Sequence, residues 1–278
     1  MASIGLGRWL AKKGARQGMA TATSILGLLG SQSTGARVRV LTYHRFGEAS
    51  RDPFCVSRRA FEKQMRWLAD RKLAVSLAQV EGFVAGHEAL PDGAVLVTMD
   101  DGCRSVFTDA LPVLRDHDVP AVAYVPAGVV GEEDVEGYDE PAMTWEELAR
   151  LPEAGIAVGS HAFHHRSLGR AKPEVAREEA IRSRELLGRR LGAPVTSFAY
   201  PFGTRVDYSD VTRDILREAG YATAFTSQHG AVAPGLDPLE LPRVKVEGGE
   251  PGWMFPLLCK GAMDAWAVVD RGLWRLQR

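Results

Sequence analysis

The chain has few cysteines, no long apolar run and almost no net charge. Its three cysteines are odd in number and widely spaced, which argues against a disulfide framework or a thiolate zinc cluster and favours a reducing compartment. A net charge of −1 gives no polyelectrolyte signature, so we expect no nucleic-acid partner. The 278 residues contain no internal repeat or low-complexity linker, and they suffice for one large barrel or two ordinary domains.

The N-terminus, residues 1–36, combines cations with a short apolar stretch. A mildly apolar run from Met19 to Gly30 follows the cations Arg8, Lys12, Lys13 and Arg16, an arrangement shared with secretory signals. That run is too short and polar to span a membrane, and no good cleavage site follows it. We therefore expect an uncleaved amphipathic helix, with a cleaved signal as the alternative. An uncleaved helix predicts a protein that is cytoplasmic or peripheral to the inner membrane, whereas a cleaved signal predicts a secreted protein.

Apolar runs alternate with helical patterns along most of the chain. Seven runs have the continuous apolar character of parallel strands buried on both faces: Val38–Thr42, Ala94–Thr98, Ala121–Val125, Ile156–Gly159, Thr196–Tyr200, Ala222–Thr226 and Leu241–Val244. A short extra strand is expected near Leu73–Val75. The helical patterns between them are Ser57–Arg71, Arg104–His117, Thr144–Leu151, Pro173–Leu191 and Tyr208–Ala219. This alternation predicts a single α/β barrel over residues 37–250.

The tail, residues 251–278, is expected to form a C-terminal helix rich in tryptophan. Cationic, tryptophan-bearing segments at both ends of a chain can make a peripheral contact with a membrane surface. The alternative is that both segments pack on the amino-terminal face of the barrel and close its bottom.

Polar residues fall at or near the carboxyl ends of the predicted strands. Barrel enzymes place their chemistry at this edge, whereas scattered surface polar residues would not gather there. The residues concerned are His44, Asp100, Asp101, His161, Tyr200 and Arg243. Their common position predicts an active site at this edge.

Asp100 and Asp101 end an apolar run and precede Gly102. Consecutive strand residues point to opposite faces, so the two carboxylates share a site only if the strand ends there, and Gly102 permits that turn. One carboxylate can then hold a metal while the other activates a water molecule. The alternative is an acidic turn without a catalytic role.

His161 and His165 supply two imidazoles four residues apart. Two histidines and one carboxylate leave a divalent metal with open positions for water and substrate. His164 fits this pattern less well, and we expect it not to be a ligand. Two other residues are assigned by position: His44 as a general acid for a leaving amine, and Arg243 as a partner that keeps Asp100 oriented and ionised.

Three segments together resemble the NodB-like polysaccharide deacetylases, carbohydrate esterase family 4: Thr98–Gly102, His161–His165 and Phe198–Gly203. The resemblance covers roughly Val38 to Glu247. It implies a distorted (β/α) barrel with about seven parallel strands, and hydrolytic removal of N-acetyl groups from amino sugars of a polysaccharide or glycolipid. The substrate would therefore be an acetylated glycan.

The resemblance also implies a role for each matching residue. The divalent metal, usually zinc, would be held by Asp101, His161 and His165, and Asp100 would be the general base. The acetyl groove would be lined by Tyr200, Pro201 and Phe202, with the Phe202 N–H facing the oxyanion.

The chain also departs from the family pattern. Met99 and Cys103 each stand where the family usually has an aromatic residue. Ala162 stands where the family usually has a side chain with a hydroxyl group. The arginine that often precedes the proline–aromatic pair is absent, as is a late Leu-x-His motif. Both gaps fit a branch similar to the poly-N-acetylglucosamine deacetylases, in which an early Tyr-His strand supplies the acid. The departures keep two alternatives open: a non-catalytic carbohydrate-binding barrel, and an O-acetyl esterase.

Overall fold

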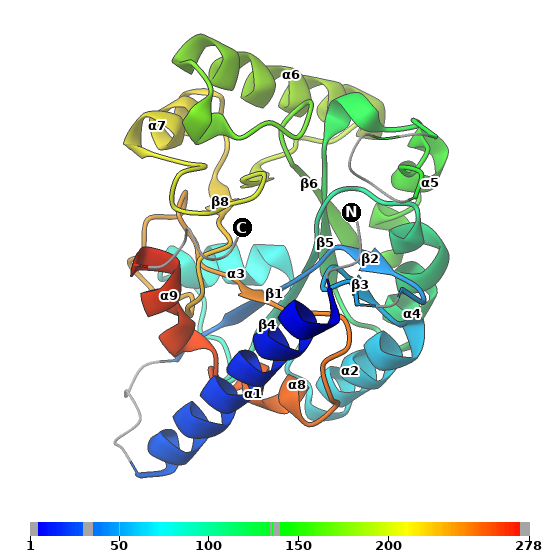
Figure 1. The fold of residues 1–278 in the computed structure, drawn as a ribbon. Helices are drawn as coiled ribbons and strands as arrows, with labels where there is room; N and C mark the ends of the chain where they lie inside the picture. The colour runs from blue at the N-terminus through cyan, green and yellow to red at the C-terminus, as the bar shows by residue number, and fades with distance from the viewer. Residues whose placement is uncertain (1–4, 30–35, 50, 134, 136–139, 273–278) are drawn as a thin grey trace.

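The structure is a computed structural model that describes residues 5–29, 36–49, 51–133, 135 and 140–272. Its centre is a curled sheet of seven parallel strands in the order β8-β7-β6-β5-β4-β1-β9 (Figure 1). The strands are β1 (Arg39–Tyr43), β4 (Val95–Met99), β5 (Ala121–Val125), β6 (Ile156–Ser160), β7 (Ser197–Ala199), β8 (Thr223–Phe225) and β9 (Val244–Lys245). The prediction of a distorted, NodB-like (β/α) barrel is confirmed.

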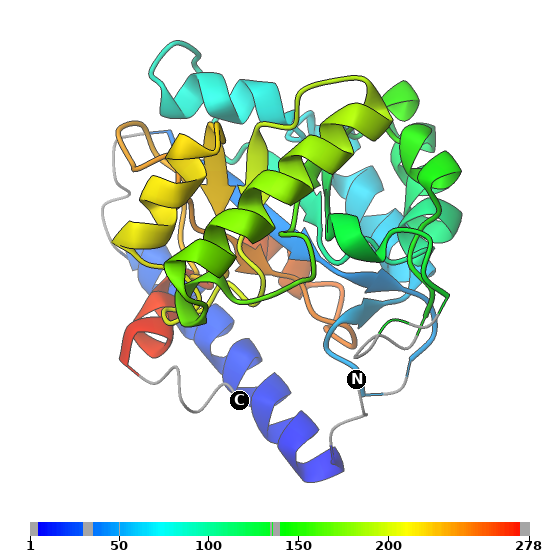
Figure 2. The ribbon, with the colours of Figure 1, turned by 90° about the horizontal axis from the view of Figure 1, so that it is seen from above.

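Helices surround this sheet (Figure 2). They are α1 (Leu6–Leu29), α2 (Arg58–Arg71), α3 (Leu77–Val84), α4 (Leu111–Asp116), α5 (Trp145–Ala149), α6 (Pro173–Leu191), α7 (Asp210–Glu218), α8 (Met254–Cys259) and α9 (Ala267–Gly272). A π-helical turn, Val106–Ala110, precedes α4. Two short strands, β2 (Arg45–Phe46) and β3 (Cys55–Val56), pair in a separate small sheet.

Both faces of the strands are buried, as expected for a parallel sheet covered by helices. Along β4, Leu96 belongs to one apolar cluster and its neighbours Val95 and Val97 to another. Because alternate strand residues share a face, the face of Leu96 continues through Thr98 to Asp100. The inner face therefore changes from apolar to polar at the carboxyl edge.

Helix boundaries follow the signals in the sequence. The Ser57 hydroxyl accepts a hydrogen bond from Ala60 N at the start of α2. Thr144 and Glu147 form a capping box at the start of α5, which satisfies N–H groups that the first helical turn leaves unpaired. Both helices therefore begin at a capping residue that the sequence supplies.

The C-terminal segment is not one continuous helix. Its described part contains α8, the 3₁₀ turn Asp264–Trp266 and α9, and residues 273–278 lie outside the description. The break falls at Gly261, which has φ +85°. A Cβ there would lie 2.2 Å from Arg39 Nη2, so only glycine lets Arg39 reach Asp264, at 2.6 Å. Helix α3 was also missed from the sequence, although Ser76 and Gln79 form a capping box at its start.

The described part of residues 1–36 contains the expected helix, α1, while residues 1–4 and 30–35 lie outside the description. Helix α1 packs against α8 and the turn Asp264–Trp266. Its Arg16 guanidinium donates to the carbonyl of Lys245 at the carboxyl end of β9. The helix therefore reaches the catalytic edge and does not simply close the bottom of the barrel. Within the described ranges, no helix is both long and apolar enough to span a membrane.

Candidate active site

The backbone turns sharply where β4 delivers its two carboxylates. Asp101 has φ +74° and Gly102 has φ +68°, so the chain leaves the extended conformation immediately after Asp100. A Cβ on Gly102 would lie 3.0 Å from a Val125 methyl carbon. Glycine therefore permits the turn that brings both carboxylates to one site.

Asp101, His161 and His165 form a compact cluster of ligand atoms. Asp101 Oδ1 lies 3.4 Å from His161 Nε2 and 3.3 Å from His165 Nε2, and the three ligand atoms are all within 4.8 Å of one another. Ligand atoms at about 2.0–2.1 Å from a tetrahedral ion are themselves roughly 3.3 Å apart. The two separations from Asp101 match this value, so the three residues could hold one divalent metal ion.

A backbone carbonyl determines which nitrogen of His161 is available. His161 Nδ1 lies 2.7 Å from the carbonyl oxygen of Ala199 at the end of β7, so Nδ1 carries the hydrogen and Nε2 presents its lone pair. This arrangement is common for histidines that bind metals.

Glu179, which sequence reasoning missed, holds the histidine loop from α6. Its buried carboxylate accepts hydrogen bonds from the backbone N–H groups of Phe163 (2.9 Å) and His164 (2.7 Å). It also lies 2.7 Å from His164 Nδ1, which turns that ring away from the cluster. A sequence signal existed, because Glu179 lies on the apolar face of α6 with Ala176 and Ser183.

Replacing Glu179 by alanine is expected to lower the free energy of unfolding by about 3 kcal/mol, because two buried N–H groups lose their acceptor. Zinc affinity should fall about tenfold or more, since the histidine loop is no longer held. Denaturant unfolding and zinc titration measure the two effects. Glu178→Ala is the matched control: Glu178 is exposed and, among the described residues, pairs with Arg182 on the same helix, so its loss should change stability by under about 0.5 kcal/mol.

Arg243 binds Asp100 through a bidentate salt bridge. Its Nη1 and Nη2 donate to the two carboxylate oxygens at 2.8 and 2.7 Å, and its Nε donates to the Thr226 carbonyl at 2.8 Å. Burial alone would raise the pKa of Asp100, but the charge of Arg243 outweighs it and the pKa lies below its ordinary value. The predicted pairing of Arg243 with Asp100 is present, and it keeps the carboxylate ionised and oriented.

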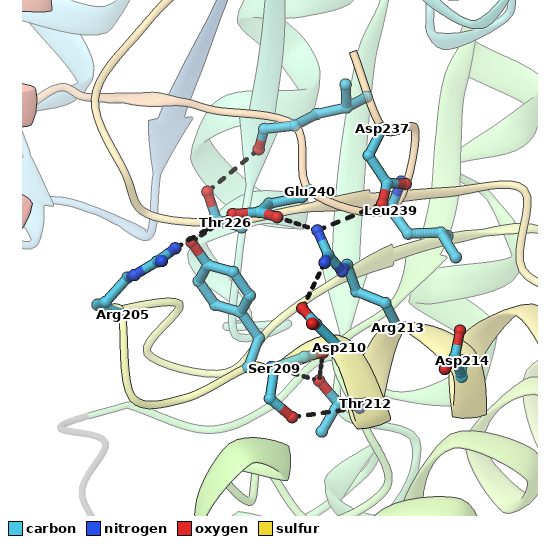
Figure 3. A network of polar contacts seen from close by, with 12 residues as sticks. Arg205, Ser209, Asp210, Thr212, Arg213, Asp214, Thr226, Asp237, Leu239 and Glu240 are labelled. Atoms are coloured by element: carbon cyan, nitrogen blue, oxygen red, sulfur yellow. Dashed lines mark hydrogen bonds and ion pairs between the residues drawn. The ribbon is translucent and has the colours of Figure 1, made fainter.

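A surface network holds the segment that leads into Arg243 (Figure 3). Arg213 of α7 contacts Glu240, Asp210 and, at 3.3 Å, Asp237. Glu240 also accepts from the Tyr208 hydroxyl at 3.1 Å. These contacts tie α7 to the chain just before β9.

The turn after β7 lies at the edge of the cluster, and within the described structure it leaves one backbone N–H without an acceptor. Phe202 has φ +63°, its ring centroid is 4.9 Å from that of His165, and no acceptor in the described part of the chain takes its N–H. The side chains of Tyr200 and Pro201 are buried instead, and the Tyr200 hydroxyl donates to the Leu239 carbonyl at 3.0 Å. Phe202 is therefore the member of this trio that faces the site.

Several residues with strained backbone conformations lie in or beside this site. Non-glycine residues with positive φ include Asp101, Ala162, His165 and Phe202, all in or beside the cluster. Such conformations persist only where surrounding structure enforces them, and they are common at functional sites.

His44 follows β1 and is held by packing. Its ring lies edge-on to Phe54 with centroids 4.9 Å apart, and its buried Nδ1 has no hydrogen-bond partner in the described structure. Lys245, a second residue that sequence reasoning missed, places its ammonium 4.7 Å from the centre of the same Phe54 ring. Burial lowers the pKa of His44 to about 4 and that of Lys245 to about 8.

The barrel and the cluster of carboxylates and imidazoles at its carboxyl edge define a NodB-like hydrolase. A family model described as polysaccharide deacetylase matches residues 87–224. The solved structure of IcaB from Ammonifex degensii has 31% sequence identity and a TM-score of 0.70, and the alignment covers 82% of this chain and 97% of that one. The chain belongs to the polysaccharide deacetylase family, and it is a hydrolase of non-peptide carbon–nitrogen bonds.

Two further relatives agree with this assignment. A poly-beta-1,6-N-acetyl-D-glucosamine N-deacetylase of Staphylococcus aureus is 22% identical over 202 residues, which are 69% of this chain and 68% of the relative. The deacetylase PplD of Streptococcus pyogenes, solved with acetate, has a TM-score of 0.71 at 22% identity, and the match covers 82% of this chain and 99% of that one. The PplD likeness supports the fold alone.

Proposed function

We propose that this protein is a metal-dependent N-deacetylase of a polymer of N-acetylglucosamine. The observation that carries the proposal is the spacing of Asp101, His161 and His165, whose ligand atoms fit one tetrahedral ion. Zinc is the metal we propose, since it readily accepts a mixed set of nitrogen and oxygen ligands. When bound, the ion would act as a Lewis acid that polarises the acetyl carbonyl and acidifies a water molecule.

The remaining chemistry is assigned to side chains and to one backbone amide. Asp100, kept ionised by Arg243, would take a proton from the attacking water as its oxygen bonds to the acetyl carbon. The Phe202 N–H would donate to the oxyanion that develops on the carbonyl oxygen. Breaking the carbon–nitrogen bond then releases acetate and an amino sugar.

His44 is proposed to protonate the departing nitrogen. With a pKa of about 4, the free ring is neutral at neutral pH, so it must take up a proton from solvent during turnover, and Asp100 returns to solvent the proton that it took from water. The negative charge of the developing oxyanion favours the protonated ring, and we place the proton uptake at that stage. Lys245 and Phe54 would fix the ring orientation, because no hydrogen bond in the described structure holds Nδ1.

The substrate class rests on the relatives. The Staphylococcus aureus relative is named for poly-beta-1,6-N-acetyl-D-glucosamine, so we propose β-1,6-linked N-acetylglucosamine oligomers as substrates. Acetate release from these oligomers by the zinc-loaded protein, compared with β-1,4-linked oligomers, tests the proposal. Faster release from the β-1,6 series supports it. Zinc-loaded protein that releases no acetate from either series would contradict it.

Replacing His44 by alanine is expected to lower kcat on the N-acetyl substrate by about 10²–10⁴-fold, the usual contribution of a general acid. An ester releases an oxygen leaving group that needs less help from an acid, so O-acetyl substrates should lose less. Parallel kcat measurements on N-acetyl and O-acetyl sugars separate the two reactions. Full activity of His44→Ala on both would show that His44 is not the acid and would favour esterase chemistry.

A further inference from the structure

The polarity of α1 is the reverse of that of an ordinary surface helix. Its cations Lys13 and Arg16 are only 5% and 2% exposed, and they bond to Glu247 and Glu250 at 2.9 and 2.6 Å. Such helices normally bury apolar residues and expose charges. The outward face of α1 instead carries apolar side chains that nothing in the described structure covers.

Exposed apolar side chains gather around this helix. On α1, Leu6, Leu10 and Ile25 are 57%, 59% and 54% exposed. Trp253 and Val268 add to them from the C-terminal segment, which packs against α1 through α8 and the turn before α9. Figures 1 and 2 show α1 on the outside of the molecule with α9 beside it. Exposed apolar side chains on α1 and the segment that packs against it mark a candidate interaction surface.

The charge of this region indicates what covers it. Helix α1 contains four cations and no acidic residue, and the first acidic residue of the chain is Glu48. Arg8 is exposed, and Lys12 is partly exposed and pairs with Glu247 at 2.9 Å. Because the four cations of the helix outnumber the two carboxylates of Glu247 and Glu250, the region keeps a net positive charge. A second copy would bring two basic helices together, whereas anionic lipid headgroups complement them.

We infer that α1, through the exposed side chains of Leu6 and Leu10 and together with the exposed Trp253 of the C-terminal segment, docks the protein onto an anionic lipid surface. Leu6 and Leu10 would enter the headgroup boundary while nearby cations meet the headgroups. The inward cations bind this helix to the barrel, so the whole enzyme follows it to the surface.

The docking helix touches the catalytic edge. Trp9 lies so close to Gly249 that a Cβ there would be 2.5 Å from its ring, and Arg16 donates to the Lys245 carbonyl at 2.8 Å. Lys245 packs on the Phe54 ring that contacts His44. The lipid surface would therefore lie beside the active site, within reach of a glycan held at a membrane.

Flotation of the full-length, zinc-loaded protein with lipid vesicles tests the inference. Wild-type protein should float with vesicles of phosphatidylcholine plus phosphatidylglycerol, and less with phosphatidylcholine alone. The double variant Leu6→Gln/Leu10→Gln should bind at least about tenfold more weakly, because it buries less apolar surface. Val211→Gln on α7, which changes a side chain 53% exposed, is the matched control and should bind as wild type does.

Two further measurements separate docking from catalysis and from self-association. Acetate release from soluble oligomers should be the same for the double variant and wild type, so a failure of the proposed function leaves the docking result interpretable. Wild-type protein that does not float with anionic vesicles, or a double variant that floats equally well, overturns the inference. So does a wild-type dimer in sedimentation that the double variant converts to monomer without any vesicle binding.

Discussion

Replacing Asp100 by asparagine is expected to lower kcat by about 10²–10⁴-fold while zinc content stays that of wild type. Asparagine has nearly the size of aspartate but cannot accept a proton from water at neutral pH. Asp100 is not among the clustered ligand atoms, so the metal site should survive. Steady-state kinetics and elemental analysis of the same preparation measure both quantities.

The matched control for this substitution is Asp214→Asn on α7. Asp214 is an exposed carboxylate that pairs with Arg217 three residues away, so kcat and zinc content should both be unchanged. Loss of zinc together with activity in Asp100→Asn would place Asp100 in the ligand set. Activity close to wild type would remove it as the base.

Replacing Asp101 by alanine is expected to abolish zinc binding and acetate release together. Asp101 Oδ1 is the atom that both imidazole nitrogens approach, and without it two neutral ligands remain. Loss of a residue that only supports a ligand commonly costs 10–100-fold in metal affinity, so the loss of this ligand should exceed about a hundredfold. Isothermal titration with zinc and kinetics at saturating zinc test this result.

The backbone at Asp101 calls for a second variant. Its φ of +74° disfavours alanine, whereas asparagine tolerates such a conformation. Asp101→Asn should therefore fold as wild type does and still bind zinc much more weakly. Unfolding curves for both variants distinguish loss of the ligand from loss of the turn. Wild-type zinc affinity in Asp101→Asn would contradict the ligand assignment.

Local pattern predicted six of the seven sheet strands and the edge that carries the polar residues, whereas the predicted run Leu241–Val244 overlaps β9 (Val244–Lys245) only at Val244. The run that ends at Asp100 predicts β4 to within a residue of its observed bounds, because a buried parallel strand is apolar on both faces. The Arg243–Asp100 pairing was expected because both residues lie at or near the carboxyl ends of predicted strands, although the observed strand β9 (Val244–Lys245) begins only after Arg243. These features depend on strand direction and not on side-chain detail.

The supporting residues were harder to predict because they act across long sequence separations. Glu179 bonds to backbone N–H groups of Phe163 and His164, and Lys245 reaches the ring of Phe54. Neither contact is marked by a recognisable sequence motif. The C-terminal helix is likewise interrupted at Gly261 because the Arg39 side chain occupies the space where a Cβ would lie. The periodicity of the sequence does not reveal this contact.

Removal and restoration of zinc in the wild-type protein tests the central claim most directly. The protein is stripped with a chelator, checked for metal by elemental analysis, and assayed for acetate release from N-acetylglucosamine oligomers before and after zinc is added. We predict that the stripped protein releases no acetate and that a single zinc ion per chain restores release. Full activity in protein verified to be free of metal would contradict the account.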